Sequence, residues 1–306
     1  MKQFFQEALE SNEVEQLLMY GAVQGFPPLV DCLKERLAKK YGFDFETNDL
    51  YIVSGGTQAA DVVSKIWLEK GDAVITEEPS YASMYNIFRA YEADLIGVPI
   101  DETGMDTDAV EEALKTNPKV KLIYTIPSFQ NPTGFSAAAE KRKKLYDLAC
   151  KYDVIIFEDD PYAELRFEGE TVNPIKSYDI DGRVFYTSSL SKVIAPSFRL
   201  GYLVVKKEFG KLVNVCKQCT DVHSNTIGQY VAWGVMTKTD YEGHIKKAQE
   251  EYRRKSSLIV ETLKKYMHPS CRLSHPTGGM FIMMFMPDTI DAVDFTWKGI
   301  DRGVVC

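Results

Sequence analysis

The chain has 306 residues, of which 45% are hydrophobic and 26% charged, and its 36 Lys and Arg against 44 Asp and Glu give a net charge of -8. This composition is typical of a globular protein with one large core or two smaller ones. The acidic balance, without any basic run, argues against nucleic-acid binding, and no apolar run approaches the ~20 residues that a membrane-spanning helix needs.

The amino-terminal residues and the cysteines both indicate a reducing compartment. The segment Met1–Glu7 lacks the apolar core and cleavage site of a signal peptide, so we expect a cytoplasmic protein. The scattered cysteines are therefore expected to be free thiols. Cys216 and Cys219, with His223, suggest zinc, but their segment is predicted to be helical and no second ligand pair follows, so we expect no metal site. The cysteines are Cys32, Cys150, Cys216, Cys219, Cys271 and Cys306.

The middle of the chain alternates short β-rich runs with helical patterns, after a helix expected at Pro27–Lys40. Strands are expected at Tyr51–Ser54, Ala73–Thr76, Asp94–Ile100, Lys121–Ile126, Val154–Glu158, Val184–Ser188 and Leu200–Val205. Helices between them are expected at Gln58–Glu69, Ala82–Tyr91, Thr107–Thr116 and Ala137–Tyr152. This alternation predicts an α/β fold, a three-layer α/β/α sandwich with a mainly parallel seven-stranded sheet. The last strand follows too soon for a helical crossover, so we expect an antiparallel edge or a loop return.

A long charged helix, expected at Asp240–Tyr266, marks the domain boundary. Two β-like runs, Cys271–Ser274 and Met280–Met286, and a helical Ala292–Lys298 follow it, which is too little for a complete second domain. We therefore expect an amino-terminal segment at 1–45, a large domain at 46–240 and an incomplete small domain at 241–306.

Polar or glycine-containing segments follow five of the predicted strands. Because ligands of open α/β sheets bind at the carboxyl ends of the strands, these segments are expected to converge. The segment Ser54–Gln58 opens a helix, and its glycines allow backbone N–H groups to approach an anion such as phosphate, although a plain turn is the alternative. Tyr81 follows the second strand and has the shape to stack on a flat ring, or simply to pack.

The later segments add groups with specific chemistry. The turn Asn131–Gly134 holds an amide donor in place. Asp159 lies at the end of a buried apolar strand, where it needs a cation, and a protonated pyridine nitrogen would be a suitable one. Lys192 ends the next strand as a nucleophile, and Arg199 follows closely enough to share a phosphate with the nearby serine hydroxyls.

Together these motifs resemble those of the class I/II, fold-type I pyridoxal-phosphate aminotransferases. The resemblance runs from about Tyr20 to about Phe285 and is strongest for the branch with the 2-aminoadipate and kynurenine aminotransferases. Its motifs are Asn131-Pro132-Thr133-Gly134, Asp159-Asp160-Pro161-Tyr162, Ser189-Leu190-Ser191-Lys192 and Arg199-Leu200-Gly201-Tyr202.

The resemblance implies a role for each matching residue. Lys192 would hold pyridoxal 5'-phosphate as a Schiff base, Asp159 would pair with the pyridine nitrogen, and Tyr81 would stack on the ring. Asn131 and Tyr162 would hold the phenolic oxygen of the ring, and Lys192, Asp159 and Tyr162 would be catalytic. Phosphate contacts are implied for Gly56, Thr57, Ser189 and Arg199, and Gln58 and Ser191 are expected as further cofactor-binding residues. Tyr20, in the motif Tyr20-Gly21-Ala22-Val23-Gln24-Gly25, would reach the phosphate in a neighbouring subunit, so the resemblance implies a homodimer.

The implied activity is transfer of an amino group from an amino acid to a 2-oxo acid, with 2-oxoglutarate as the expected acceptor and Lys192 also moving the proton. Two alternatives share the cofactor site: a non-catalytic effector domain of a GntR-type transcription regulator, and a pyridoxal-phosphate-dependent carbon–sulfur lyase. Family members are usually longer at both ends and carry a carboxyl-terminal Arg for the substrate carboxylate. Arg302 does not match that position, so we expect a truncated chain and leave the carboxylate ligand and the amino donor open.

Overall fold

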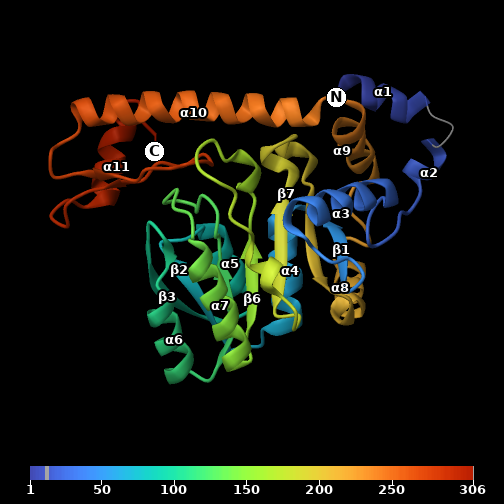
Figure 1. Ribbon diagram of the computed structural model, residues 1–306, viewed down its shortest axis with the longest axis horizontal. Coiled ribbons are helices and arrows are strands. Elements are labelled where there is room, and N and C mark those ends of the chain that lie inside the picture. Colours follow the sequence, from blue (N-terminus) through green and yellow to red (C-terminus); the bar gives the residue numbers. More distant parts are fainter. Residues whose placement is uncertain (11–13, 306) are drawn as a thin grey trace.

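The computed structural model of the protein describes residues 1–10 and 14–305. It contains a sheet covered by helices on both faces, with one long helix running past it (Figure 1). The strand order is β1-β8-β7-β6-β5-β2-β3-β4. The strands are β1 (Asn48–Val53), β2 (Ala73–Glu78), β3 (Asp94–Asp101), β4 (Gly104–Met105), β5 (Val120–Thr125), β6 (Ile155–Asp159), β7 (Val184–Ser189) and β8 (Gly201–Lys206).

All seven predicted strands are confirmed, with bounds shifted by a few residues, but the sheet has eight strands rather than seven. The additional strand β4 pairs with the end of β3. With two residues, β4 is too short to show any hydrophobic alternation in the sequence. Strands β3, β2, β5, β6 and β7 are parallel. Strand β8 is antiparallel to β7, as expected, but it is not an edge strand, because β1 pairs with its other side.

The predicted helices are also present. They are α3 (Pro27–Tyr41), α4 (Gly55–Trp67), α5 (Ala82–Ala90), α6 (Thr107–Thr116), α7 (Ala139–Tyr152), α8 (Gly210–Gln218), α10 (Tyr241–Tyr266) and α11 (Ala292–Ile300). The structure adds α1 (Lys2–Glu10), α2 (Val14–Leu18) and α9 (Thr226–Lys238). Helix α9 escaped prediction because it is apolar on nearly every side and packs between α1 and α3, so it lacks an amphipathic period.

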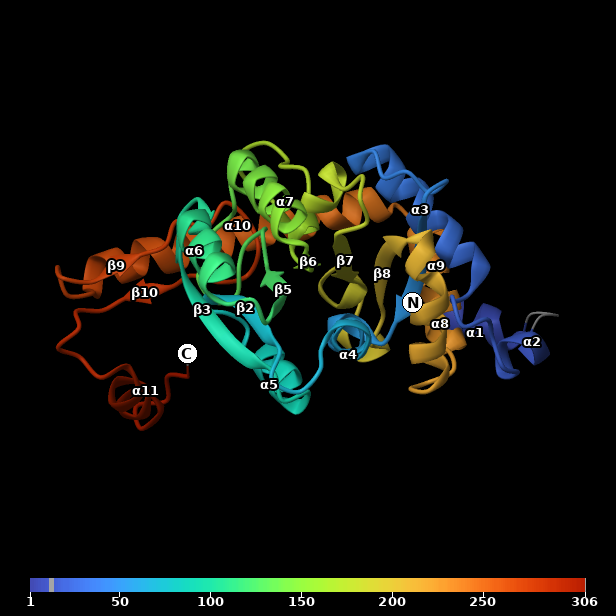
Figure 2. The same ribbon diagram turned by 90° about the horizontal axis from the view of Figure 1, so that it is seen from below.

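Helices cover the sheet in two layers, which Figure 2 shows from below. Helices α4, α5 and α8 pack on one face, and α6 and α7, with α3 and α9 beside them, pack on the other. Alternate residues of each strand therefore enter different cores: Tyr51 and Val53 of β1 face α4, whereas Leu50 and Ile52 face α3. A sheet buried on both faces leaves its strand ends as the accessible places for a site.

Helix α10 carries the carboxyl-terminal residues away from the sheet (Figure 1). There β9 (Arg272–Leu273) pairs with β10 (Met284–Phe285), and α11 follows with Trp297 62% exposed. The three-part division of the chain stays a prediction. None of the helices within the described ranges is both long and apolar enough to cross a membrane. The five described cysteines are free thiols, and Cys306 lies outside the described residues.

Candidate functional site

The pairing of three strands brings the predicted loops to one edge of the sheet. Val53 of β1 pairs with Gly201 of β8, and Gly201 pairs with Ser189 of β7. The residues just beyond this row are therefore neighbours, although they come from distant parts of the sequence. Two residues further in along β7, Thr187 pairs with Asp159 of β6. The sheet register thus gathers the loops after β1, β6 and β7 with the loop before β8.

The amino end of α4 lies against Arg199. Gly55 has a positive φ of 75°, and a Cβ at this position would lie 2.7 Å from Nη2 of Arg199. Only glycine therefore allows this backbone shape and this close approach. The first N–H groups of a helix have no partner within the helix, and the helix dipole makes this end positive. The α4 amino end and the guanidinium thus form one cationic surface.

The loop before α4 is held from within by a buried amide. Oε1 of Gln58 accepts a hydrogen bond from the Ser54 N–H at 2.6 Å and another from Nζ of Lys217 at 3.3 Å. Lys217, buried in α8, also donates to Oδ1 of Asp221 at 3.1 Å, and burial lowers its pKa. The Gln58 side chain therefore holds the loop in shape, which leaves its backbone as the group available for an anion.

The end of β7 supplies two serines and a lysine. Oγ of Ser189 accepts a hydrogen bond from the Ser191 N–H at 3.1 Å and donates to the Leu200 carbonyl at 3.3 Å. Lys192 ends the following 3-10 turn and is exposed. Oγ of Ser191 is buried, and in the described part of the chain it has no hydrogen-bond partner. Because a buried hydroxyl usually has a hydrogen-bond partner, this one is available to a ligand.

Neither cation at this edge has a counter-ion within residues 1–10 and 14–305, since Lys192 and Arg199 form no ion pair there. With the unpartnered Ser191 hydroxyl and the α4 amino end, they form a site suited to an oxyanion with several negative charges.

A buried carboxylate lies directly beneath the α4 loop. Asp159 is 5% exposed, and a Cβ on Gly56 would lie 3.5 Å from its Oδ1. Its Oδ2 accepts a hydrogen bond from the Tyr124 hydroxyl at 3.1 Å. Burial raises the pKa of Asp159 to about 7, and the Tyr124 bond acts in the opposite direction. The carboxylate is thus suited to a cationic ligand that would lower this pKa.

The two acidic neighbours of Asp159 have other partners. Burial raises the pKa of Glu158 to about 8, and its carboxylate accepts the N–H groups of Ile175 and Lys176 at 2.7 and 2.8 Å. Burial also raises the pKa of Asp160, and the positive charge of Arg142 acts in the opposite direction on both Glu158 and Asp160. Arg142 therefore acts on the two flanking carboxylates, whereas Asp159 faces the α4 loop.

Three further predicted residues lie on adjacent loops. Tyr162 is buried, which raises its pKa, and its hydroxyl is hydrogen-bonded to the Asn131 side chain. The Phe281 ring packs edge-on against Tyr162 with ring centroids 5.5 Å apart. Tyr81 is the half-buried residue at the N-cap position of α5, and it packs against the core cluster that contains Tyr162. Asn131 and Tyr162 are thus paired donors beside the aromatic ring of Tyr81.

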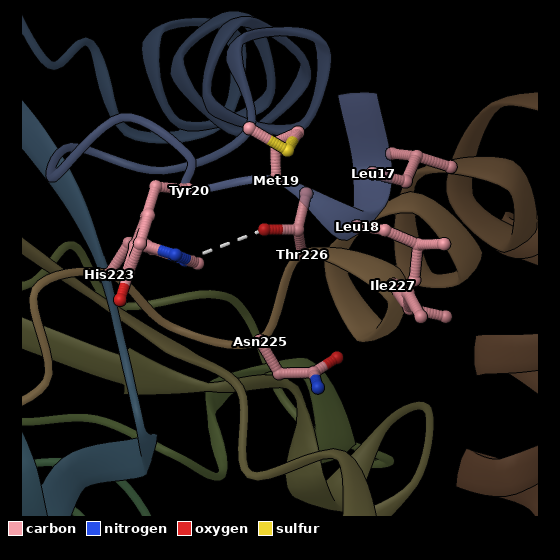
Figure 3. A pocket seen from close by; sticks show the side chains of 8 residues that line it. All are labelled: Leu17, Leu18, Met19, Tyr20, His223, Asn225, Thr226 and Ile227. Atoms are coloured by element: carbon pink, nitrogen blue, oxygen red, sulfur yellow. Dashed lines mark hydrogen bonds between the residues drawn. The ribbon is translucent and has the colours of Figure 1, made fainter. Parts of the chain in front are cut away.

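Tyr20 lies in a cavity of about 480 Å³ next to this edge (Figure 3). It is 85% exposed, and its ring stands at 90° to the His223 ring with centroids 5.9 Å apart. A second cavity of about 380 Å³ is lined by Ser54 and Arg199, and the two cavities share Asn225. Within one chain, Tyr20 and Arg199 therefore line neighbouring cavities rather than the same one.

Sequence patterns had no signal for several residues of this region. Tyr124, Gln130, Lys217 and Asn225 look like ordinary strand, turn or helix residues, and only contacts with distant segments place them at the site. The described residues contain no group of three or more His, Cys, Asp or Glu side chains arranged to hold a metal ion.

Comparison with known proteins gives consistent matches along nearly the whole chain. The sequence model for aminotransferase class I and II matches residues 2–306. Aromatic-amino-acid aminotransferase 1 of Thermococcus litoralis is 36% identical over 302 residues, which cover 97% of this chain and 72% of that protein.

Solved structures agree with the sequence matches. Pyrococcus horikoshii kynurenine aminotransferase, in complex with PMP, has a TM-score of 0.95 at 37% identity, covering 99% of this chain and 76% of its own. The α-aminoadipate aminotransferase of Thermus thermophilus, complexed with N-(5'-phosphopyridoxyl)-L-leucine, has a TM-score of 0.91 at 28% identity, covering 99% and 77%.

Proposed function

The chain belongs to the class I and II aminotransferases, and from this premise we propose that the sheet edge around Lys192 and Arg199 is its pyridoxal 5'-phosphate site. The resemblance inferred from the motifs is confirmed, and so is the fold type. The protein is a pyridoxal-phosphate-dependent aminotransferase, an enzyme that transfers an amino group from an amino acid to a 2-oxo acid. These matches favour the transferase over the lyase and the regulator domain.

The observation that supports the proposed site is that cations without counter-ions and a buried carboxylate lie on either side of the α4 loop. Above the α4 loop, Arg199, Lys192 and the Ser191 hydroxyl lack partners in the described part of the chain and fit a phosphate. Below the loop, Asp159 is a buried carboxylate with a raised pKa and fits a protonated ring nitrogen. Pyridoxal phosphate carries both groups, a ring nitrogen that can be protonated and a phosphate on a short arm of the same ring, so the residues present fit this cofactor.

Each residue has a distinct task in this proposal. Arg199 and the N–H groups of Gly56 and Thr57 bind the phosphate, with Ser189 and Ser191 beside them. Asp159 keeps a proton on the ring nitrogen, because a buried carboxylate stabilises the positive charge next to it. When bound, pyridoxal phosphate supplies an electron sink for the negative charge that develops on the amino acid Cα.

Three residues act on the substrate side of the ring. Asn131 and Tyr162 would hold the phenolic oxygen of the cofactor as hydrogen-bond donors. Nζ of Lys192 would attach the cofactor, and the same amine would be the general base for the proton on Cα of the substrate. Its exposed side chain has the freedom that these two positions require.

The substrates are proposed at a finer level from the relatives. Kynurenine, aromatic and α-aminoadipate aminotransferases share this fold at 28 to 37% identity. We therefore expect an aromatic or long-chain amino acid as donor and 2-oxoglutarate as acceptor. Mixing the holoenzyme with a panel of amino acids tests this, because a donor should remove the absorbance band of the bound cofactor and 2-oxoglutarate should restore it. Release of ammonia without recovery of the band would instead indicate a lyase.

We also propose a homodimer in which Tyr20 reaches the phosphate site of the neighbouring subunit. Its 85% exposure on one chain, beside the cavity that contains Arg199, supports this arrangement. Sedimentation equilibrium tests it, and a monomeric holoenzyme with full cofactor affinity would contradict it. A cytoplasmic location stays a prediction from the sequence.

Replacing Arg199 with Gln should weaken binding of pyridoxal phosphate by roughly 10- to 100-fold, because charge-assisted hydrogen bonds to an anion contribute about 1.5–3 kcal/mol. Fluorescence titration of the apoprotein measures the dissociation constant. Pyridoxal, which has no phosphate, is the matched ligand, and its affinity should stay unchanged. Equal weakening for both ligands would contradict a phosphate role for Arg199.

Replacing Gly55 with Ala should also weaken binding of pyridoxal phosphate, by about 10-fold or more, because the new Cβ displaces the Arg199 guanidinium. Gly42 is the matched control, since its φ is 71° but a Cβ there would meet nothing within 4 Å. Both variants should lose about 1–2 kcal/mol of unfolding free energy in urea from the left-handed backbone. Only Gly55→Ala should alter cofactor affinity, and equal affinities in the two variants would count against the proposed contact.

A further inference from the structure

A buried carboxylate, Glu77, lies at the carboxyl end of β2, outside the residues assigned to the cofactor. It is 1% exposed, and each hydrogen-bond partner of its carboxylate in the described residues is a donor. The Thr125 hydroxyl donates to Oε1 at 2.6 Å and the Ile126 N–H at 3.0 Å, and both of these residues are at the end of β5. Nε2 of Gln130 donates to Oε2 at 3.0 Å. The carboxylate thus joins the ends of β2 and β5 to the turn that follows.

The Gln130 side chain connects Glu77 to Pro79 and Thr133 through hydrogen bonds. It is fully buried, and its Nε2 also donates to the Pro79 carbonyl at 2.8 Å. Its Oε1 accepts the Thr133 N–H at 3.0 Å and the Thr133 hydroxyl at 2.7 Å. The amide orientation is therefore fixed at both ends, because the backbone N–H of Thr133 can only donate and the Pro79 carbonyl can only accept.

This relay lies between two loops that face the ring. Pro79 precedes the loop that carries Tyr81, and Gln130 is the residue before Asn131. The turn that holds Asn131 is closed by the Gly134 N–H bonded to the Gln130 carbonyl at 2.6 Å. Asn131 in turn is hydrogen-bonded to Tyr162. Glu77 is thus connected to the donors of the phenolic oxygen without touching them.

We propose that Glu77 is a positioning residue of the cofactor site, whose carboxylate orients the Gln130 amide and thereby fixes Asn131 against the ring. This inference depends on the proposed cofactor site and adds to it a residue that the motifs do not include. The side-chain amide of a Gln at position 77 would place an N–H₂ donor against neighbouring groups that are themselves donors. The Gln130 amide would then have to turn over, which would direct its own N–H₂ at the Thr133 N–H and break the turn's internal bonds.

The test is the pH titration of the absorbance of the bound cofactor in four proteins: wild type, Glu77→Gln, Glu77→Asp and Glu78→Gln. Hydrogen bonds donated to the phenolic oxygen stabilise its negative charge, so a displaced Asn131 should raise the pKa of the chromophore. We expect Glu77→Gln to raise it by about one unit. Glu77→Asp keeps the charge and should shift it less. Glu78→Gln removes the adjacent exposed carboxylate and should leave it as in the wild type.

Thr133→Val approaches the same relay from its other end and covers the case in which Glu77→Gln does not fold. It removes one donor to Gln130 Oε1 and should raise the chromophore pKa in the same direction. A wild-type chromophore pKa in Glu77→Gln, or in Thr133→Val if only that variant folds, would overturn the inference, even if unfolding in urea becomes easier. A wild-type protein that binds no pyridoxal phosphate would overturn the proposed function itself, and the inference with it.

Discussion

The Lys192→Ala variant should lose transamination almost completely, with kcat reduced by roughly 10⁴-fold or more. The substitution removes both the amine that attaches the cofactor and the base that moves the Cα proton, and a positioned acid–base group alone contributes typically 10²–10⁴-fold. Cofactor should still bind, because the contacts of its phosphate with Arg199 and the α4 amino end remain. Its spectrum, however, should be that of free pyridoxal phosphate.

Two controls make this result specific. Lys70→Ala removes an exposed lysine on the loop before β2 and should behave as wild type. Methylamine added to Lys192→Ala should partly restore proton transfer, because it supplies an amine of similar basicity to the vacated position. Turnover of Lys192→Ala within ten-fold of the wild type, at about the same cofactor affinity, would be incompatible with the role given to this residue.

The Asp159→Asn variant should have opposite effects on activity and on stability. With cofactor bound, kcat should fall by roughly 10²- to 10⁴-fold, since an amide does not stabilise the protonated ring nitrogen through which the electron sink operates. Steady-state kinetics at saturating pyridoxal phosphate measures this. The effect should be much larger than that of Asp153→Asn, a substitution at an exposed carboxylate just before β6.

Without cofactor, the same variant should be more stable than the wild type above pH 7. The folded pKa of Asp159 is about 7, raised by burial from 3.8, so the folded chain holds a proton that the unfolded chain releases. Stability is therefore lost as pH rises from about 4 to about 7, on the order of 4 kcal/mol for a shift of this size. Urea unfolding of the two apoproteins at pH 5 and pH 8 should show the gap opening with pH. A gap that stays constant would contradict a buried, unpaired carboxylate at this position.

Much of the candidate site was predictable because its motifs are local. The glycines before α4, the turn at Asn131 and the Lys192 segment each follow a strand that is apolar enough to be recognised, and strand ends of a parallel sheet converge. The order of the elements then fixes which loops meet. The prediction therefore required only that the strands be found, and not that their packing be known.

The supporting residues could not be predicted in the same way. The hydrogen bond between Lys217 and Gln58 joins residues 159 positions apart in the sequence, and the one between Glu77 and Gln130 joins residues 53 positions apart. No local sequence pattern predicts either contact. Arg142 opposes the rise in pKa of Asp160 and Glu158 but does not act on Asp159, and no sequence pattern indicates this division. Which carboxylate is left for a ligand depends on the packing of α7, which the β6 motif does not contain.

The most direct test of the account is to reduce the holoenzyme with borohydride and map the modified peptide by mass spectrometry. Reduction makes a Schiff-base bond permanent, so the account predicts one phosphopyridoxyl group per chain, on Lys192, and none after the same treatment of Lys192→Ala. A phosphopyridoxyl group on another lysine, or no adduct in protein that has retained its chromophore, would contradict it.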